Sequence, residues 1–216
     1  MRLGILGGTF DPIHVGHLAA ARAAVECADL DRVLFIPSAQ PPHRGAAAAS
    51  AADRLAMTRL AVEGDSRFDV SDIEVGRGGV SYTADTLTEL HRAHPEDDLF
   101  LILGWDAARL FSTWHEPERV SALASVVIVG RPGTQTPGPS EVAAAGLDPA
   151  RVINCFVETP DVSASELREL LAAGESAAGK VAPAVERYIT SKQLYPHPAG
   201  PAKRTGPTSP GGGEAG

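Results

Sequence analysis

The sequence predicts an α/β fold in which helices cover both faces of a doubly wound parallel sheet. Short apolar segments, such as residues 99–103 and 125–130, have the length and composition of buried strands. Helix-forming segments separate such runs, and this regular alternation is typical of parallel sheets. With 216 residues, the chain is long enough for one domain to bury roughly two-thirds to three-quarters of its unfolded surface.

The elements are expected in the following order. Residues 2–6 form a short apolar strand, and residues 15–28, which are rich in alanine, favour a helix. Residues 33–36 form a second strand that Pro37 ends. This β-α-β unit requires parallel strands joined by a right-handed crossover. Further strands are expected at residues 68–75, 99–103, 125–130 and 152–157, and further helices at residues 53–62, 83–94, 165–171 and 183–189 and from Pro117 onward.

Two stretches between these elements are expected to be loops. Residues 37–52 contain a Pro-Pro pair that cannot be helical, and residues 132–149 are rich in Pro, Gly and Ala and predict a surface excursion. We expect residues 1–195 to form one domain that ends in a small C-terminal helical subdomain, residues 160–195. Residues 196–216 have almost no apolar side chains, which predicts a disordered tail.

Charge and cysteine content restrict the function and the location. The formal net charge of −8 argues against binding to nucleic acid or to an anionic membrane surface. Cys27 and Cys155 lie far apart among small or apolar neighbours, which favours buried free thiols over a disulfide and therefore the cytoplasm. The apolar N-terminal run is too short for a secretion signal or a membrane span.

The densest group of candidate functional residues follows the first predicted strand. Residues 7–18 read Gly-Gly-Thr-Phe-Asp-Pro-Ile-His-Val-Gly-His-Leu. The glycines allow backbone N–H groups to approach a phosphate, and the N-terminus of the next helix adds partial positive charge. His14 and His17 are three residues apart, so both imidazoles can lie on one side of the first helical turn and donate to triphosphate oxygens.

Other interpretations of the histidine pair carry less weight. A zinc site needs a third ligand, and Asp11 is the nearby candidate, so we expect no protein-bound metal. Two polar residues on a surface helix would not account for the Gly-Gly-Thr-Phe-Asp-Pro segment in front of them. The segment also lacks the Gly-Lys-Ser/Thr of a P-loop and the glycine spacing of a dinucleotide-dehydrogenase fingerprint.

Several segments together resemble the bacterial nicotinate-nucleotide adenylyltransferases of the nucleotidyltransferase superfamily. Residues 7–18 resemble the T/H-x-G-H signature of the superfamily, and Ser-Tyr-Thr-Ala-Asp-Thr-Leu at residues 81–87 resembles a segment of that family. The other similar segments are Gly-Trp-Asp through Thr-Trp at residues 104–114, Ser-Ala-Ser-Glu-Leu-Arg at residues 163–168, and residues 181–195. The resemblance extends from residue 1 to residue 195 and implies a Rossmann-like sheet.

The resemblance implies adenylyl transfer from ATP to nicotinate mononucleotide, which gives nicotinate adenine dinucleotide and pyrophosphate in NAD biosynthesis. It implies Mg²⁺ that is carried by the triphosphate rather than by a carboxylate cage. The catalytic residues it implies are His14, His17 and Arg168. The ATP-binding residues it implies are Gly7, Gly8, Thr9, Phe10, His14, His17, Gly104, Asp106, Ser163 and Arg168. The residues implied for nicotinate mononucleotide are Thr9, Arg44, Tyr82, Thr83 and Trp114.

Some residues in these segments also have a structural interpretation beside the ligand-binding one. Asp106 could accept a ribose hydroxyl or cap a helix, and Trp114 could stack on the pyridine ring or pack under a loop. Trp105 either narrows the adenosine side or packs outward. The Tyr82–Thr83 turn offers N–H and hydroxyl donors to a carboxylate.

Two other functions stay open from the sequence. One is an adenylyltransferase for another phosphate ester, of the phosphopantetheine type, and the other is a nucleotide-binding protein without catalysis. The sequence does not give the oligomeric state, and a homo-oligomer is compatible with it.

Overall fold

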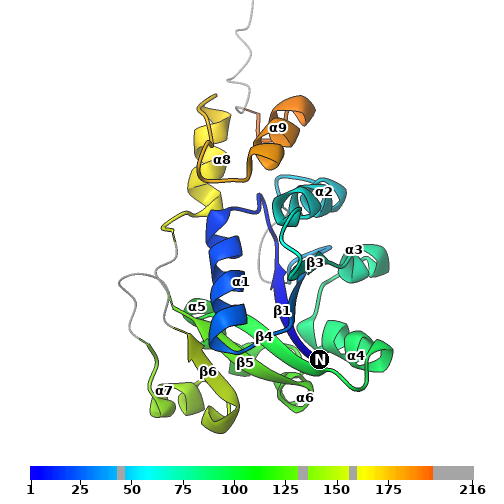
Figure 1. The fold of residues 1–216 in the computed structure, drawn as a ribbon, viewed down its shortest axis with the longest axis vertical. Coiled ribbons are helices and arrows are strands. Elements are labelled where there is room, and N and C mark those ends of the chain that lie inside the picture. The colour runs from blue at the N-terminus through cyan, green and yellow to red at the C-terminus, as the bar shows by residue number, and fades with distance from the viewer. Residues whose placement is uncertain (43–46, 131–135, 156–159, 197–216) are drawn as a thin grey trace, which may run out of the picture.

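The computed structural model describes residues 1–42, 47–130, 136–155 and 160–196. Its centre is a parallel sheet with the strand order β3-β2-β1-β4-β5-β6 (Figure 1). The strands are β1 (Arg2–Gly8), β2 (Arg32–Pro37), β3 (Phe68–Val70), β4 (Asp98–Gly104), β5 (Ala124–Val129) and β6 (Val152–Cys155). The order changes direction between β1 and β4, which is the switch point of a doubly wound sheet. The predicted fold class is confirmed.

Helices cover both faces of the sheet. They are α1 (Val15–Cys27), α2 (Ala51–Val62), α3 (Ile73–Arg77), α4 (Thr83–Ala93), α5 (Trp105–Ala108), α6 (Pro117–Leu123), α7 (Pro139–Ala144), α8 (Ala164–Ala172) and α9 (Pro183–Lys192), with short 3-10 turns at Phe111–Thr113 and Pro149–Arg151. Successive side chains of β1 point to opposite faces: Leu3 and Ile5 join the core beneath α4 and α6, and Leu6 joins the core beneath α1, α2, α8 and α9.

Two predicted elements differ from the structure. The strand expected at residues 68–75 ends at Val70, because Ser71 and Asp72 begin the short helix α3: the Ser71 hydroxyl accepts a hydrogen bond from the Ile73 N–H at 3.2 Å, and Asp72 is the N-cap. The excursion expected at residues 132–149 contains α7, whose Val142 is buried in the core. The described part of that stretch is therefore a packed element and not a surface loop.

The C-terminal helices share a core with the first half of the chain. Leu167 of α8 and Ile189 of α9 are buried in the same cluster as α1 and α2. In Figure 1 these two helices lie beyond one end of α1, and α9 lies next to α2. The division into one domain with a C-terminal helical part stays a prediction, and residues 197–216 of the expected tail lie outside the described residues.

The two cysteines correct the sequence-based expectation. Cys27, at the end of α1, and Cys155, at the end of β6, form a disulfide with their Cα atoms 5.8 Å apart, so the prediction of free thiols is wrong for this structure. The two residues are 128 positions apart in sequence. Their proximity results from the packing of α1 on β6, which cysteine spacing alone does not reveal.

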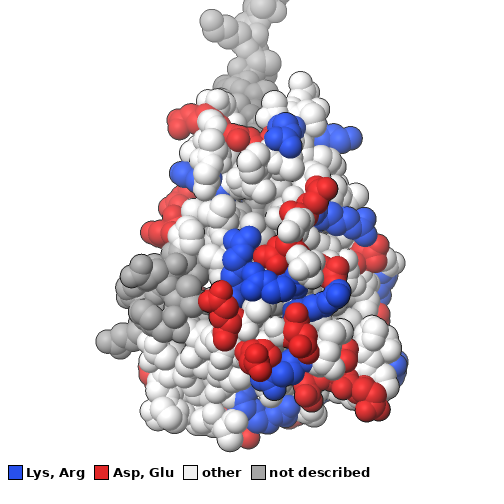
Figure 2. All heavy atoms as spheres, in the orientation of Figure 1, with Lys and Arg blue, Asp and Glu red and all other residues white. Residues whose placement is uncertain are grey.

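The surface and the helices also bear on possible partners. In Figure 2, basic and acidic side chains are intermixed on the face shown, with no extended basic area among its described residues. This distribution agrees with the net charge of −8. Across residues 1–42, 47–130, 136–155 and 160–196, no helix has both the length and the apolar content to cross a membrane.

Candidate functional site

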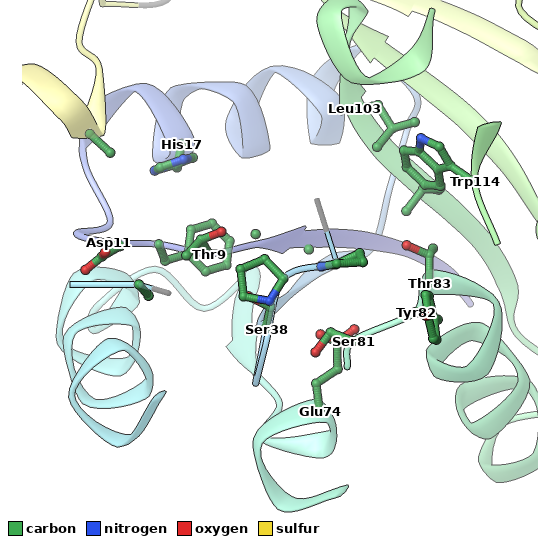
Figure 3. Close-up of a pocket in the computed structure, with 18 of the residues that line it drawn as sticks. Thr9, Asp11, His17, Ser38, Glu74, Ser81, Tyr82, Thr83, Leu103 and Trp114 are labelled. Atoms are coloured by element: carbon green, nitrogen blue, oxygen red, sulfur yellow. The ribbon is translucent and has the colours of Figure 1, made fainter. Parts of the chain in front are cut away.

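A cavity of about 550 Å³ opens at the carboxyl ends of β1 and β4, where the strand order changes direction. Segments far apart in the sequence form its walls (Figure 3). They are the turn after β1 (Gly7, Gly8, Thr9, Phe10, Asp11), His17 of α1, the segment after β2 (Ser38, Pro41, Pro42, Ala47), the α3–α4 region (Glu74, Ser81, Tyr82, Thr83), Leu101 and Leu103 of β4, Trp114 and His115, and α8 (Ala164, Arg168).

The turn after β1 is shaped by close packing around Gly8. A Cβ atom at Gly8 would lie 2.8 Å from the Phe10 ring, so a larger residue would displace that ring. Phe10 has a positive φ of 49° and packs edge-on against His17, with 5.0 Å between the ring centroids. This arrangement leaves the backbone of residues 8–10 along the cavity, as a phosphate-binding turn requires.

His17 lies in the cavity wall, and His14 lies behind it. The His14 N–H donates to Nδ1 of His17 at 3.2 Å, so the hydrogen bond assigns the proton of a neutral His17 ring to Nε2. The two rings stack with centroids 3.7 Å apart, and His14 is only 5% exposed. His17 is therefore placed as a hydrogen-bond donor in the cavity, whereas the contacts of His14 begin the helix and support the His17 ring.

The start of α8 brings a cation to the same wall. Ser163 caps this helix, and its hydroxyl accepts a hydrogen bond from the Glu166 N–H at 3.1 Å. Arg168, one turn further on, donates from Nη1 to the carbonyl of Asp11 at 2.8 Å and lines the cavity. The structure thus brings Arg168 to the turn after β1, although 157 residues separate it from Asp11. Ser163 is seen as a helix cap.

Tyr82, Thr83 and Trp114 lie on the opposite wall (Figure 3). α4 begins at Thr83, and among the described residues no side-chain hydrogen bond caps it, so its first N–H groups are left for a ligand. Trp114 lines the cavity and also packs on Phe111, with ring centroids 5.5 Å apart. The contact with Phe111 agrees with the structural interpretation of this tryptophan, and its stacking on a pyridine ring stays a prediction.

The expected adenosine-binding residues do not come together in this cavity. Among the described residues that line it, neither Gly104 nor Asp106 occurs. Gly104 is the N-cap of α5, and the Asp106 side chain is 82% exposed and lies 3.7 Å from Arg109. Trp105 packs against the core on the α4 face. The roles of Gly104 and Asp106 stay predictions, and Arg44 lies outside the described residues.

Arg54 is an important residue that the sequence did not indicate. Its side chain, on α2, is almost completely buried, and it donates hydrogen bonds to four backbone carbonyls. The acceptors are Thr9 at 2.6 Å, Ser38 at 2.7 Å, Ala39 at 3.1 Å and Ala49 at 3.3 Å. The guanidinium therefore joins the turn after β1 to the segment after β2. Arg54 is one of two arginines in a helix of mainly apolar residues, and no spacing in the sequence distinguishes it from the exposed Arg59.

Asp11 is used as a structural acceptor. Its carboxylate accepts hydrogen bonds from the N–H groups of Ala48 and Ala49 at 2.7 and 3.1 Å, and from the Tyr195 hydroxyl at 2.8 Å. Burial and the Asp11 charge raise the pKa of Tyr195. These contacts connect the C-terminal end of the described chain to the turn after β1. Within residues 1–42, 47–130, 136–155 and 160–196, no group of three His, Cys, Asp or Glu side chains could hold a metal ion.

Glu74 is a second residue that the sequence did not indicate. It lines the cavity from α3 and is only 7% exposed, and its Oε1 accepts a hydrogen bond from the Thr86 hydroxyl at 2.7 Å. Burial raises the pKa of Glu74. A buried carboxyl group in a cleft is a candidate functional group. The sequence did not indicate this role, because Glu74 falls within residues 68–75, which were predicted to form a strand.

Comparisons with known proteins identify the family and similar folds. Residues 5–170 match the family model described as cytidylyltransferase-like. A Thermus thermophilus protein with the curated name "Probable nicotinate-nucleotide adenylyltransferase" is 47% identical over 195 residues, which cover 90% of this chain and 100% of that protein. A Geobacter protein of the same name is 45% identical, with 90% and 98% covered. The fold resembles that of the Plasmodium falciparum nicotinic acid mononucleotide adenylyltransferase complexed with NaAD, with a TM-score of 0.72, 19% identity, and 90% and 97% of the two chains covered.

Proposed function

The chain belongs to the nicotinate-nucleotide adenylyltransferase family, and we propose that it transfers the adenylyl group of ATP to nicotinate mononucleotide. Family membership confirms the resemblance found in the sequence. The observation that carries the proposal is one cavity with two chemically different walls. His17 and Arg168 stand at a phosphate-binding turn, and the start of α4 and Trp114 face them from the other side.

The phosphate wall would bind and activate ATP. The backbone of Gly8, Thr9 and Phe10 would hold phosphate oxygens, and Gly7 lines the cavity beside them at the end of β1. A phosphate oxygen of the acceptor attacks the α-phosphorus, a new P–O bond forms, and the bond to pyrophosphate breaks. The Nε2–H of His17 and the guanidinium of Arg168 would stabilise the charge that develops on the pyrophosphate. No general base is required, because the acceptor phosphate is already ionised at neutral pH.

The acceptor wall would recognise the nicotinate ring. The N–H groups at the start of α4, around Tyr82 and Thr83, carry the partial positive charge of the helix and would bind the ring carboxylate. Trp114 offers its flat face to the ring. Arg44 would bind the acceptor phosphate, and Gly104 and Asp106 would contact the adenosine. His14 and Ser163 would act by holding His17 and the start of α8 in place.

The proposal includes Mg²⁺ that is bound to the triphosphate of ATP. The carboxylate nearest the phosphate wall, Asp11, uses its oxygens for Ala48, Ala49 and Tyr195. The residues present therefore fit an ion held by the triphosphate, with His17 and Arg168 taking the remaining phosphate oxygens. Bound there, the ion would neutralise charge on the leaving pyrophosphate.

We place the reaction in the cytoplasm, where ATP is available. Disulfides are unusual in that compartment, and the pair Cys27–Cys155 lies at the end of α1 away from His17. The state of this disulfide is therefore separate from the chemistry that we propose.

A pyrophosphate-release assay tests the function. The purified chain is mixed with Mg²⁺ and ATP and, in parallel, with nicotinate mononucleotide, nicotinamide mononucleotide or phosphopantetheine. We expect the highest kcat/KM with nicotinate mononucleotide. A preference for phosphopantetheine would show that the proposed acceptor is wrong. ATP binding without pyrophosphate release in the presence of any acceptor would indicate a nucleotide-binding protein without catalysis.

A further inference from the structure

The Glu74 carboxyl group is a buried acid in the acceptor wall for which the proposed reaction has no use. It lies between α3 and the start of α4, and Figure 3 shows it pointing toward Ser81. The arginine nearest to it in sequence, Arg77, donates to Glu89 at 2.6 Å and to the Thr86 hydroxyl at 3.1 Å. Glu74 is therefore held mainly by neutral hydroxyl groups, which is unusual for a buried acid.

These hydroxyl groups lie on both sides of the Tyr82–Thr83 turn. The Thr86 hydroxyl donates to Glu74 at 2.7 Å, and Ser81 lies beside the carboxyl group, where its hydroxyl favours the charged form and lowers the pKa of Glu74 against the effect of burial. The Ser81 oxygen accepts from the Ala39 N–H at 2.9 Å, so its proton is the one available for the carboxyl group. Both hydroxyl groups are buried. One carboxyl group thus contacts Ser81, immediately before the turn, and Thr86, in the first turn of α4.

The backbone around the turn depends on the same contacts. The Ser81 N–H donates to the Gln40 carbonyl at 2.9 Å, which ties the turn to the segment after β2. The Thr86 N–H donates to the Tyr82 carbonyl at 3.2 Å and closes the first turn of α4. The direction of the first N–H groups of α4 is therefore set by Ser81 on one side and by Thr86 on the other. Both of these residues converge on Glu74.

We propose that Glu74 is a positioning residue that holds the start of α4, through Ser81 and Thr86, in the orientation that selects an acceptor bearing a carboxylate. This inference rests on the proposed function. The quantity affected is the preference for nicotinate mononucleotide, the acid, over nicotinamide mononucleotide, the amide. A carboxylate accepts hydrogen bonds from two well-aligned N–H donors more strongly than a neutral amide oxygen does. Loss of alignment should therefore weaken binding of nicotinate mononucleotide more than binding of nicotinamide mononucleotide.

The test compares Glu74→Ala with the wild type in the pyrophosphate-release assay. KM for nicotinate mononucleotide should rise about tenfold, as expected when hydrogen bonds of a buried group are lost, and the preference for the acid over the amide should fall by a similar factor. KM for ATP should stay within about twofold, because the phosphate wall is unchanged. Glu74→Gln, whose amide oxygen can still accept the Thr86 proton, should lie between the two.

Two further variants separate positioning from stability alone. Glu89→Gln changes a carboxylate on α4 that accepts a hydrogen bond from Arg77, and it should leave the acid preference unchanged. Ser81→Ala removes the same link from its other end, so it should reproduce the loss of preference even if Glu74→Ala does not fold. Lower stability with an unaltered preference in the folded variants would overturn the positioning role. A wild-type enzyme that prefers another acceptor would overturn the proposed function as well.

Discussion

The two walls of the cavity are built in different ways. The phosphate wall comes largely from one continuous segment, residues 7–17, in which β1, a tight turn and the first turn of α1 follow one another. The acceptor wall is assembled from the segment after β2, the α3–α4 region and the residues around Trp114. Its geometry depends on buried polar contacts between distant segments, such as those of Glu74. Residues 7–17 are thus positioned mainly by local structure, whereas Arg168 and the acceptor wall are positioned by tertiary packing.

The largest expected effect follows from removing the donor at the phosphate wall. His17→Ala should lower kcat about 10²- to 10³-fold, because a preorganised donor to the developing charge is removed. The fold should persist, since the hydrogen bond that the His17 ring accepts from the His14 N–H contributes only about 1 kcal/mol to stability. Steady-state kinetics and a thermal melt measure the two quantities.

A matched control is His91→Ala, which changes an exposed histidine at the end of α4 and should leave kcat unchanged. Near-normal turnover in a folded His17→Ala protein would contradict the proposed role of His17 as a donor to the developing charge.

The second effect tests the connection between the two walls. Arg54→Met leaves four carbonyls, those of Ser38 and Ala49 at buried hydrogen bonds and those of Thr9 and Ala39 at partly buried ones, without this donor, and should lower the free energy of unfolding by about 3 kcal/mol. Because Arg54 holds both sides of the cavity, KM for both substrates should rise. Urea denaturation and steady-state kinetics measure these changes.

The control on the same helix is Arg59→Met, which removes an exposed ion pair with Asp72 and should change stability by only about 0.5 kcal/mol. If Arg54→Met raised KM for one substrate alone, Arg54 would not connect the two walls, and each wall would keep its geometry independently of the other.

The same contrast explains what the sequence could predict. The apolar strands, the helix after residues 7–14 and the helix that begins at Thr83 are local patterns, and the structure has all of them. Arg54 and Glu74 could not be recognised, because charged residues are normally exposed and their burial depends on partners elsewhere in the chain. The Cys27–Cys155 disulfide was mispredicted for the same reason: the packing of α1 against β6 joins residues with no sequence relation.

The smallest expected effect concerns the pH dependence of stability. Burial raises the pKa of Glu74 above its ordinary value of 4.5, so the folded protein binds this proton more tightly than the unfolded chain does. The stabilisation from this group is fully present below pH 4.5 and is lost as the pH rises through the raised pKa. Glu74→Gln, a neutral group of similar shape, should not lose it.

The measurement is urea unfolding of the wild type and Glu74→Gln at several pH values from 4 to 8. The stability of the variant relative to the wild type should increase as the pH rises, whereas Glu118→Gln, at an exposed position of α6, should show no such trend. A difference between wild type and Glu74→Gln that stays constant with pH would mean that Glu74 carries its charge in the folded protein. The acceptor wall would then hold a buried negative charge beside the proposed carboxylate site, and that charge would disfavour the acid acceptor. The selectivity of this wall would in that case have to come from contacts other than those of Glu74.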